Sequence, residues 1–121
     1  MKVGFIGIGT MGASMALNVR AKGYDVVVND IRREAAAPHL KAGATWADSA
    51  RKVAEAADVV FTSLPGPKEV EAVADDLFAG MRKGTAWFDL STNSPTVVRR
   101  LSERFAAKDR KSTRLNSSHL A

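Results

Sequence analysis

The 121-residue chain contains no cysteine, and its apolar runs are short and broken by glycine. Without cysteine the chain has neither a disulfide framework nor a thiolate metal site. No apolar run approaches the roughly 20 residues that cross a bilayer. The start, MKVGFIGIG, places one lysine before an apolar stretch, but no convincing cleavage site follows, so we interpret it as a buried strand rather than a signal peptide. These absences fit a cytoplasmic protein.

Aromatic residues are few, at 7%, and they do not alternate with the basic residues that give the formal net charge of +5. Because the basic residues are scattered and form no stripe, the sequence argues against a nucleic-acid partner. Four acidic residues indicate a solvated helix face rather than a metal site: Glu69, Glu71, Asp75 and Asp76. The hydrophobic fraction of 45% and charged fraction of 26% are typical of one globular domain.

Apolar runs and helical patterns alternate along the chain. Strands are expected at 3–6, 25–30, 45–47, 59–64 and 85–90, and helices at 10–21, 33–42, 48–57, 68–78 and 94–107. The strands are apolar throughout rather than alternating, which is typical of parallel strands covered on both faces. Strand–helix alternation requires right-handed crossovers. The predicted fold class is therefore α/β, a Rossmann-type doubly wound parallel sheet of about five strands in the order 3-2-1-4-5.

Residues 4–18 read GFIGIGTMGASMALN and contain the spacing G-x-G-x-x-G between a predicted strand and a predicted helix. In that context Gly7 allows a tight turn, Gly9 leaves room for a pyrophosphate, and Gly12 lets the helix pack against the strand. The N-terminus of the helix offers backbone N–H groups to an anion. The stretch predicts a dinucleotide-binding loop.

The residue that ends the second predicted strand bears on the choice of cofactor. Asp30 follows Gly12 by 18 residues, where a carboxylate accepts hydrogen bonds from an adenosine ribose and repels a 2′-phosphate. Arg32 and Arg33 argue the other way, because a guanidinium pairs well with a 2′-phosphate. The sequence favours NAD and leaves NADP open.

Five further side chains are assigned to the scaffold, excluded from catalysis or left open. Trp46 and Trp87 are expected to be core or partly buried scaffold. His39 is expected on a surface-like helix and His119 in the tail, and neither is expected to be catalytic. Met11 could pack near a nicotinamide or could fill the core beside the start of the helix, and the sequence does not decide between these two positions.

Three stretches together resemble one family. The glycine loop extends to G-x-G-x-M-G-x-x-M-A-x-N, the fourth predicted strand ends in Leu64-Pro65, and the fifth ends in DLSTNSP over residues 89–95. Residues 1–107 resemble the cofactor-binding half of the β-hydroxyacid dehydrogenases, which include 3-hydroxyisobutyrate dehydrogenase, tartronate semialdehyde reductase and, more distantly, 6-phosphogluconate dehydrogenase. The D-x-S-T-x-x-P element is the most specific part.

The resemblance implies roles for particular residues. Leu64 and Pro65 would line the cofactor cleft, Thr92 would contact the nicotinamide side, and Ser91 would bind the substrate carboxylate. A helix-capping turn before Pro95 is the alternative for Ser91 and Thr92. The cofactor-binding candidates are Gly7, Ile8, Gly9, Thr10, Met11, Gly12, Asp30, Arg32, Leu64, Pro65 and Thr92, and the substrate-binding candidates are Ser91 and Thr92.

Members of the family also have a catalytic residue and a second domain that have no counterpart in this sequence. In the family a lysine on a helix after a sixth strand acts as general acid or base, and an all-helical second domain completes the site and forms a homo-oligomer. We therefore assign no catalytic residue here and expect residues 1–108 to be a truncated cofactor-binding domain without its helical domain. Residues 109–119, DRKSTRLNSSH, read as a codon-by-codon translation of a common sequencing adapter, so residues 109–121 are expected to be non-native. The alternative is a genuine disordered basic tail.

The function expected from these residues is the NAD(P)-binding part of an oxidoreductase. Its parent would transfer a hydride between the nicotinamide and a small 3-hydroxy acid or its semialdehyde, without nucleic-acid or membrane partners. The chain alone would be inactive. The alternatives are an imine reductase of the same superfamily, a freestanding non-catalytic nucleotide-binding domain, and a non-catalytic scaffold that has kept the fold.

Overall fold

The computed structural model describes residues 1–82 and 84–90, and the side chains of Thr10, Met11 and Pro67 are left out of that description. Five strands form one sheet: β1 (Lys2–Ile6), β2 (Asp25–Asn29), β3 (Thr45–Trp46), β4 (Val59–Thr62) and β5 (Ala86–Asp89). Every pairing is parallel. The order β3-β2-β1-β4-β5 confirms the predicted doubly wound sheet. The predicted helix over 94–107, Ser91, Thr92 and the tail lie outside the described residues.

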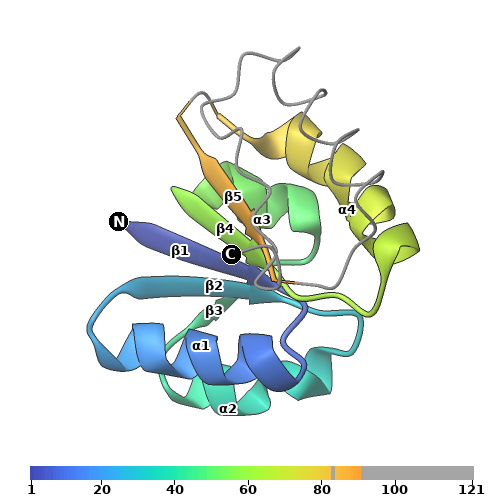
Figure 1. Ribbon diagram of the computed structural model, residues 1–121. Coiled ribbons are helices and arrows are strands. Elements are labelled where there is room, and N and C mark those ends of the chain that lie inside the picture. The colour runs from blue at the N-terminus through green and yellow to red at the C-terminus, as the bar shows by residue number, and fades with distance from the viewer. Residues whose placement is uncertain (83, 91–121) are drawn as a thin grey trace.

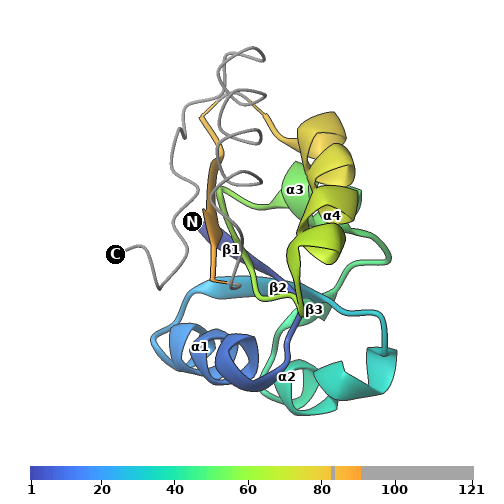
Figure 2. The same cartoon turned by 45° about the vertical axis from the view of Figure 1, so that its right-hand side comes forward.

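Helices cover both faces of the sheet. Figures 1 and 2 show α1 (Thr10–Ala21) and α2 (Ala37–Lys41) on one side and α3 (Ala50–Ala56) and α4 (Pro67–Gly80) on the other. Ser49 caps α3, since its hydroxyl accepts a 3.2 Å hydrogen bond from the Lys52 amide. Gly23, with a φ of +94°, follows the end of α1. None of the described helices combines the length and hydropathy of a bilayer-spanning segment.

Successive residues of the strands point alternately into two separate hydrophobic cores, one on each face of the sheet. Because both faces are buried, the strands are apolar throughout. Ile6, Val27 and Val60 point to the α3–α4 face and pack with Trp87 and Leu77. The residues between them point to the α1–α2 face, where the buried set is Val3, Phe5, Ile8, Ala16, Val26, Val28, Ala36 and Ala44. Trp87 is fully buried and Trp46 is partly buried, so both belong to the scaffold as predicted.

The predicted helix over 33–42 is wrong in detail. A 3-10 turn covers Arg33–Ala36, and the α-helix begins only at Ala37, which places Pro38 in its first turn. Proline is tolerated there because the first-turn N–H groups have no intrahelical partner, whereas in the middle of a longer α-helix it would break a hydrogen bond.

His39 is not on the surface, which corrects the sequence-based expectation. It is 2% exposed, and its Nε2 lies 3.1 Å from the Ala13 carbonyl oxygen of α1. Because α2 packs against α1 at this point, the imidazole lies in the contact between the two helices. It lies outside the set of residues that line the cavity described below.

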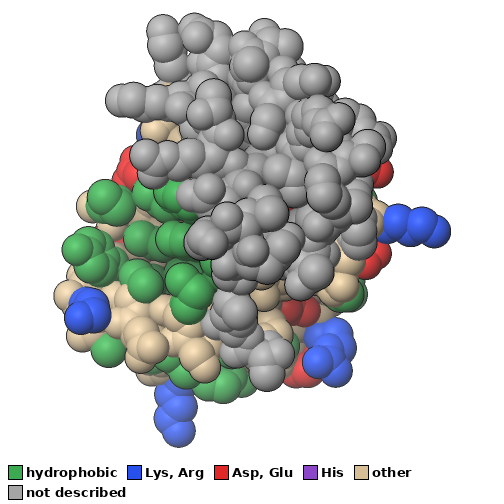
Figure 3. All heavy atoms as spheres, viewed as in Figure 1, with side chains coloured by type: hydrophobic (Ala, Val, Ile, Leu, Met, Phe, Trp, Pro, Cys, Tyr) green, Lys and Arg blue, Asp and Glu red, His purple; other side chains and the backbone are tan. Residues whose placement is uncertain are grey.

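Basic side chains are dispersed over the surface. On the face drawn in Figure 3, the Lys and Arg side chains of the described residues stand apart from one another. This agrees with their scattered positions in the sequence.

Candidate functional site

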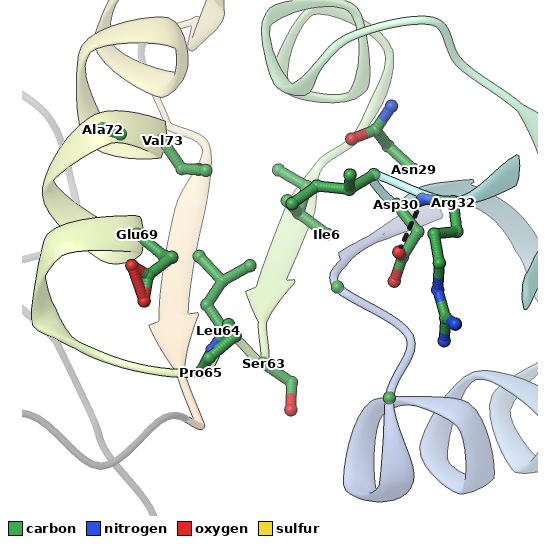
Figure 4. A pocket seen from close by; sticks show the side chains of 13 residues that line it. Ile6, Asn29, Asp30, Arg32, Ser63, Leu64, Pro65, Glu69, Ala72 and Val73 are labelled. Carbon is green, nitrogen blue, oxygen red and sulfur yellow. Dashed lines mark hydrogen bonds between the residues drawn. The ribbon is translucent and has the colours of Figure 1, made fainter.

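A cavity of about 600 Å³ opens where β1, β2 and β4 end. The sheet order reverses here, because β1 pairs with β2 on one side and with β4 on the other. Ligands of open α/β sheets bind at this kind of switch point, beyond the carboxyl ends of the strands. Figure 4 shows two walls with a gap between them. We call Gly7, Gly9, Asp30 and Arg32 the loop wall, and Leu64, Pro65, Ala72 and Val73 the helix wall.

The first glycine shapes the turn after β1. Gly7 has a φ of +81°, a conformation that L side chains rarely adopt, and a Cβ there would collide with the Ser63 carbonyl oxygen. Its amide donates a 2.9 Å hydrogen bond to the Asn29 carbonyl oxygen of β2. Gly7 is thus required by the protein itself.

Gly9 and Gly12 differ in what their missing side chains leave free. A Cβ on Gly12 would collide with the Gly7 carbonyl oxygen, so Gly12 allows α1 to approach the loop. A Cβ on Gly9 would meet nothing within 4 Å and would project into open space at the cavity. The bare backbone at Gly9 therefore fits a ligand that lies against it, as a pyrophosphate would.

The N-terminus of α1 is suited to an anion. Gly9 is the N-cap, no side chain caps this end, and no acidic residue lies in the first turn. The first N–H groups of a helix lack intrahelical partners and carry a partial positive charge. A phosphate at this end would satisfy both.

Asp30 lies just beyond β2 on the loop wall. One carboxylate oxygen, Oδ2, accepts a 2.8 Å hydrogen bond from the Ile8 amide. The other, Oδ1, accepts a 3.0 Å bond from the Arg32 amide, drawn dashed in Figure 4. Each carboxylate oxygen can accept a second hydrogen bond, so the group can still receive a hydroxyl donor.

The two neighbouring arginines have different environments. Arg32 is exposed and lines the cavity. The Arg33 guanidinium instead lies over the Trp46 ring, 5.4 Å from its centroid, in a cation–π contact. Of the two, Arg32 is the one placed to meet a ligand.

Sequence reasoning missed several residues that line the cavity. Ile31 is 92% exposed at the mouth of the cavity, which is unusual for a large apolar side chain. Glu69, predicted to be a solvated acid, is half-buried and lines the cavity from the first turn of α4 beside Ala72 and Val73. Ile31 lies two residues beyond the end of β2, next to Asp30, and that position after a strand is the signal that could have identified it. Among the described residues no three His, Asp or Glu side chains cluster as a metal site would need.

A buried polar network anchors the carboxyl ends of β4 and β5. The Thr62 hydroxyl donates a 2.8 Å hydrogen bond to Asp89 and accepts a 2.9 Å bond from the Trp87 indole N–H. All three residues are at most 2% exposed. The Leu90 amide also donates to the Thr62 carbonyl oxygen at 2.7 Å. The network fixes the chain just before the Ser91-Thr92 pair.

Six of the predicted cofactor-binding residues line the cavity: Gly7, Gly9, Asp30, Arg32, Leu64 and Pro65. Ile8 and Gly12 are buried behind it and support the loop. Thr10 and Met11 begin α1, and their side chains are not described. Thr92 and Ser91 lie outside the described residues.

The fold and the glycine-lined cavity define a dinucleotide-binding domain of the doubly wound α/β class. Residues 2–114 match the family model of the NAD binding domain of 6-phosphogluconate dehydrogenase. The chain belongs to this family, as the resemblance implied.

Individual relatives agree with the family. The chain is 39% identical over 103 residues to an NAD-dependent L-serine dehydrogenase of Pseudomonas aeruginosa, covering 83% of this chain and 35% of that protein. The structure of Mycobacterium tuberculosis 3-hydroxyisobutyrate dehydrogenase with L-serine is 31% identical, with a TM-score of 0.84 over 90% of this chain and 38% of that one. A structure of Psf3 with NADP+ and 2-OPP is 33% identical, with a TM-score of 0.82 over 89% of this chain and 39% of that one. The chain spans little more than a third of the relatives it matches.

Proposed function

We propose that this chain is the cofactor-binding part of a dehydrogenase that transfers a hydride between a nicotinamide dinucleotide and a small 3-hydroxy acid or its semialdehyde. The observation that carries the proposal is Gly9, whose missing side chain serves no contact within the protein and opens onto the cavity. The substrate class is inferred from relatives such as the 3-hydroxyisobutyrate dehydrogenase with L-serine.

The chain's own residues would hold and orient the cofactor. The amides at the start of α1 would bind the pyrophosphate, Asp30 would accept the adenosine ribose hydroxyls, and the helix wall would cover apolar parts of the ligand. The bound cofactor supplies the hydride donor or acceptor at its nicotinamide. The family resemblance implies that Ser91 would hydrogen-bond the substrate carboxylate and that Thr92 would contact the nicotinamide, and both follow β5 in the sequence.

We propose NAD rather than NADP as the preferred cofactor. A 2′-phosphate would meet the Asp30 carboxylate, and close like charges repel. Arg32 would offset part of this repulsion, whereas Arg33 is engaged with Trp46. Two of the relatives above differ on this point, since the L-serine dehydrogenase is named as NAD-dependent and the Psf3 structure is a complex with NADP+.

We assign proton transfer to or from the substrate to residues of the parent protein that this chain does not contain. The chain covers little more than a third of its relatives, and no lysine in it matches the family's general acid or base. We propose that this chain alone binds the cofactor without turnover, and that a helical domain of the parent completes the site and forms a homo-oligomer.

A fluorescence titration of the 121-residue chain with NADH and with NADPH tests the binding proposal. We expect saturable binding of both, with NADH bound more tightly, and no oxidation of NADH when a small semialdehyde acid is added. Absence of saturable NADH binding would overturn the proposal. Tighter binding of NADPH would overturn the NAD preference alone.

A further inference from the structure

The Asp30 carboxylate is engaged with the loop as well as with the cavity. Its Oδ2 accepts a hydrogen bond from the Ile8 amide, which lies 22 positions away in the sequence and between two of the three motif glycines. Its Oδ1 is bonded to the Arg32 amide, which fixes the orientation of the carboxylate. A carboxylate hydrogen bond of this kind is about twice as strong as a neutral one.

In the part of the loop that the structure describes, the Ile8 amide makes the last hydrogen bond to the end of β2 before α1 begins. The preceding amide, that of Gly7, is bonded to the Asn29 carbonyl oxygen. The next residue, Gly9, is the N-cap of α1 and has extended backbone without a side-chain cap. Two successive loop amides are therefore held by the end of β2, one by its backbone and one by the Asp30 side chain. The direction of the following amides depends on both.

We propose that Asp30 is a positioning residue for the phosphate-binding loop, in addition to the ribose contact proposed above. This inference rests on the proposed function, since it concerns the same cofactor site. The adenosine end and the pyrophosphate end of the cofactor are then linked through one carboxylate. Loss of Asp30 would weaken the binding of a ligand that has no ribose at all.

The sign of the effect separates the two roles. If Asp30 only accepted ribose hydroxyls, its replacement by alanine would remove a negative charge near the loop, and an anion such as inorganic pyrophosphate would bind as tightly as before or more tightly. If Asp30 positions the loop, the same replacement weakens pyrophosphate binding in spite of the lost repulsion.

The test uses the 121-residue chain with inorganic pyrophosphate as the probe, followed by the amide NMR signals of the loop. We expect Asp30→Ala to weaken pyrophosphate binding at least fivefold. Asp30→Asn keeps one oxygen acceptor, which can serve the Ile8 amide, but loses the charge and the acceptor for the Arg32 amide. We therefore expect it to weaken pyrophosphate binding less than Asp30→Ala does. Asp25→Ala removes an exposed carboxylate at the opposite end of the same strand and serves as the matched control.

A second readout needs no ligand. Hydrogen exchange of the Ile8 amide should accelerate about fivefold or more in Asp30→Ala and by less in Asp30→Asn, which keeps one oxygen acceptor. Unchanged exchange in Asp30→Ala, or unchanged or tighter pyrophosphate binding, would overturn the positioning role even if NADH binds. Failure of the unaltered chain to bind NADH would instead overturn the proposed function, and the exchange measurement would still decide whether Asp30 holds the loop.

Discussion

The two walls of the cavity are built by different physics. The loop wall is held by hydrogen bonds, with the Gly7 amide on Asn29 and the Ile8 amide on Asp30, and it carries the charged groups. The helix wall is held by packing, since Leu64 and Val73 lie against the core that α3 and α4 form on the sheet. The loop wall therefore offers directional polar groups, and the helix wall offers an apolar surface of fixed shape with the Glu69 carboxylate beside it (Figure 4). This division suits a dinucleotide, which has a charged pyrophosphate at its centre and a planar ring system at each end.

The contrast also separates folding from binding within the loop wall. Gly7 and Gly12 are demanded by atoms of the protein, whereas Gly9 is not. A motif of three glycines thus contains two structural positions and one that serves the ligand. Substitutions can be chosen to alter one property without the other.

The largest effect on stability is expected for Gly7→Ala. The alanine would adopt a positive φ and collide with the Ser63 carbonyl oxygen, so the free energy of unfolding should fall by about 3 kcal/mol or more. Gly23→Ala is the matched control, because Gly23 has a φ of +94° but nothing within 4 Å of its Cβ position. It should lose only about 1 kcal/mol by urea unfolding. Equal losses at the two positions would contradict the collision.

The next effect concerns the strand ends behind the helix wall. Thr62→Val keeps the shape but removes the donor to Asp89 and the acceptor for Trp87, so the free energy of unfolding should fall by about 2 kcal/mol. Thr45 is an exposed residue at the sheet edge, and its hydroxyl makes one 3.3 Å hydrogen bond, to the Val26 carbonyl oxygen. Thr45→Val should therefore cost less than Thr62→Val, about 0.5 kcal/mol. Urea unfolding followed by Trp fluorescence measures both. A Thr62→Val chain as stable as the unaltered one would show that the network does not contribute.

Gly9→Ala should have the opposite profile to Gly7→Ala. Its stability should change by less than about 0.5 kcal/mol because the Cβ meets no protein atom. Its affinity for NADH should fall about tenfold, or about 1.4 kcal/mol, because the methyl group occupies the ligand's space. Thermal unfolding and NADH titration of the same sample give the two numbers. Unchanged NADH affinity would place the pyrophosphate elsewhere.

A smaller effect distinguishes the two arginines. Arg32→Ala should lower the affinity for NADPH about threefold relative to NADH, because the exposed guanidinium lines the cavity. Arg33→Ala should leave the ratio unchanged, because its guanidinium lies over Trp46. Parallel titrations of both variants with both cofactors measure the ratio. A shift in Arg33→Ala alone would reverse the assignment.

The smallest effect lies away from both walls. A hydrogen bond from the Lys2 amide, with further help from the Arg82 guanidinium, lowers the pKa of Asp58 from its ordinary value of 3.8. A carboxyl group with a lowered folded-state pKa stabilises the fold above pH 3.8, and this stabilisation is lost as the pH falls through the lowered value. Asp58→Asn should therefore lower Tm slightly at pH 6 and by less at pH 3. An equal Tm difference at both pH values would contradict the ionic origin.

The sequence predicted the sheet well, and it predicted Leu64 and Pro65 of the helix wall but not the part that α4 contributes. Strand order followed from the alternation of apolar runs and helical patterns, and the glycine motif located the loop wall. Glu69 was missed because helical periodicity does not say which neighbour a half-buried face meets. Ile31 was missed because it lies in a loop, where no periodic pattern indicates what a side chain faces.

His39 was misplaced because the break between the 3-10 turn and α2 depends on packing against α1. The hydrogen bond from the Ile8 amide to Asp30 could not be predicted from the sequence. It depends on how closely the loop after β1 approaches the end of β2.

The most direct test of the account maps NAD+ onto the 121-residue chain by amide NMR. The account predicts that the largest shifts fall on both walls together, at Gly7 to Gly12, at Asp30 to Arg32 and at Ser63 and Leu64. Shifts confined to one wall or to residues outside the cavity, or no shifts at millimolar NAD+, would contradict the claim that this cavity binds a nicotinamide dinucleotide.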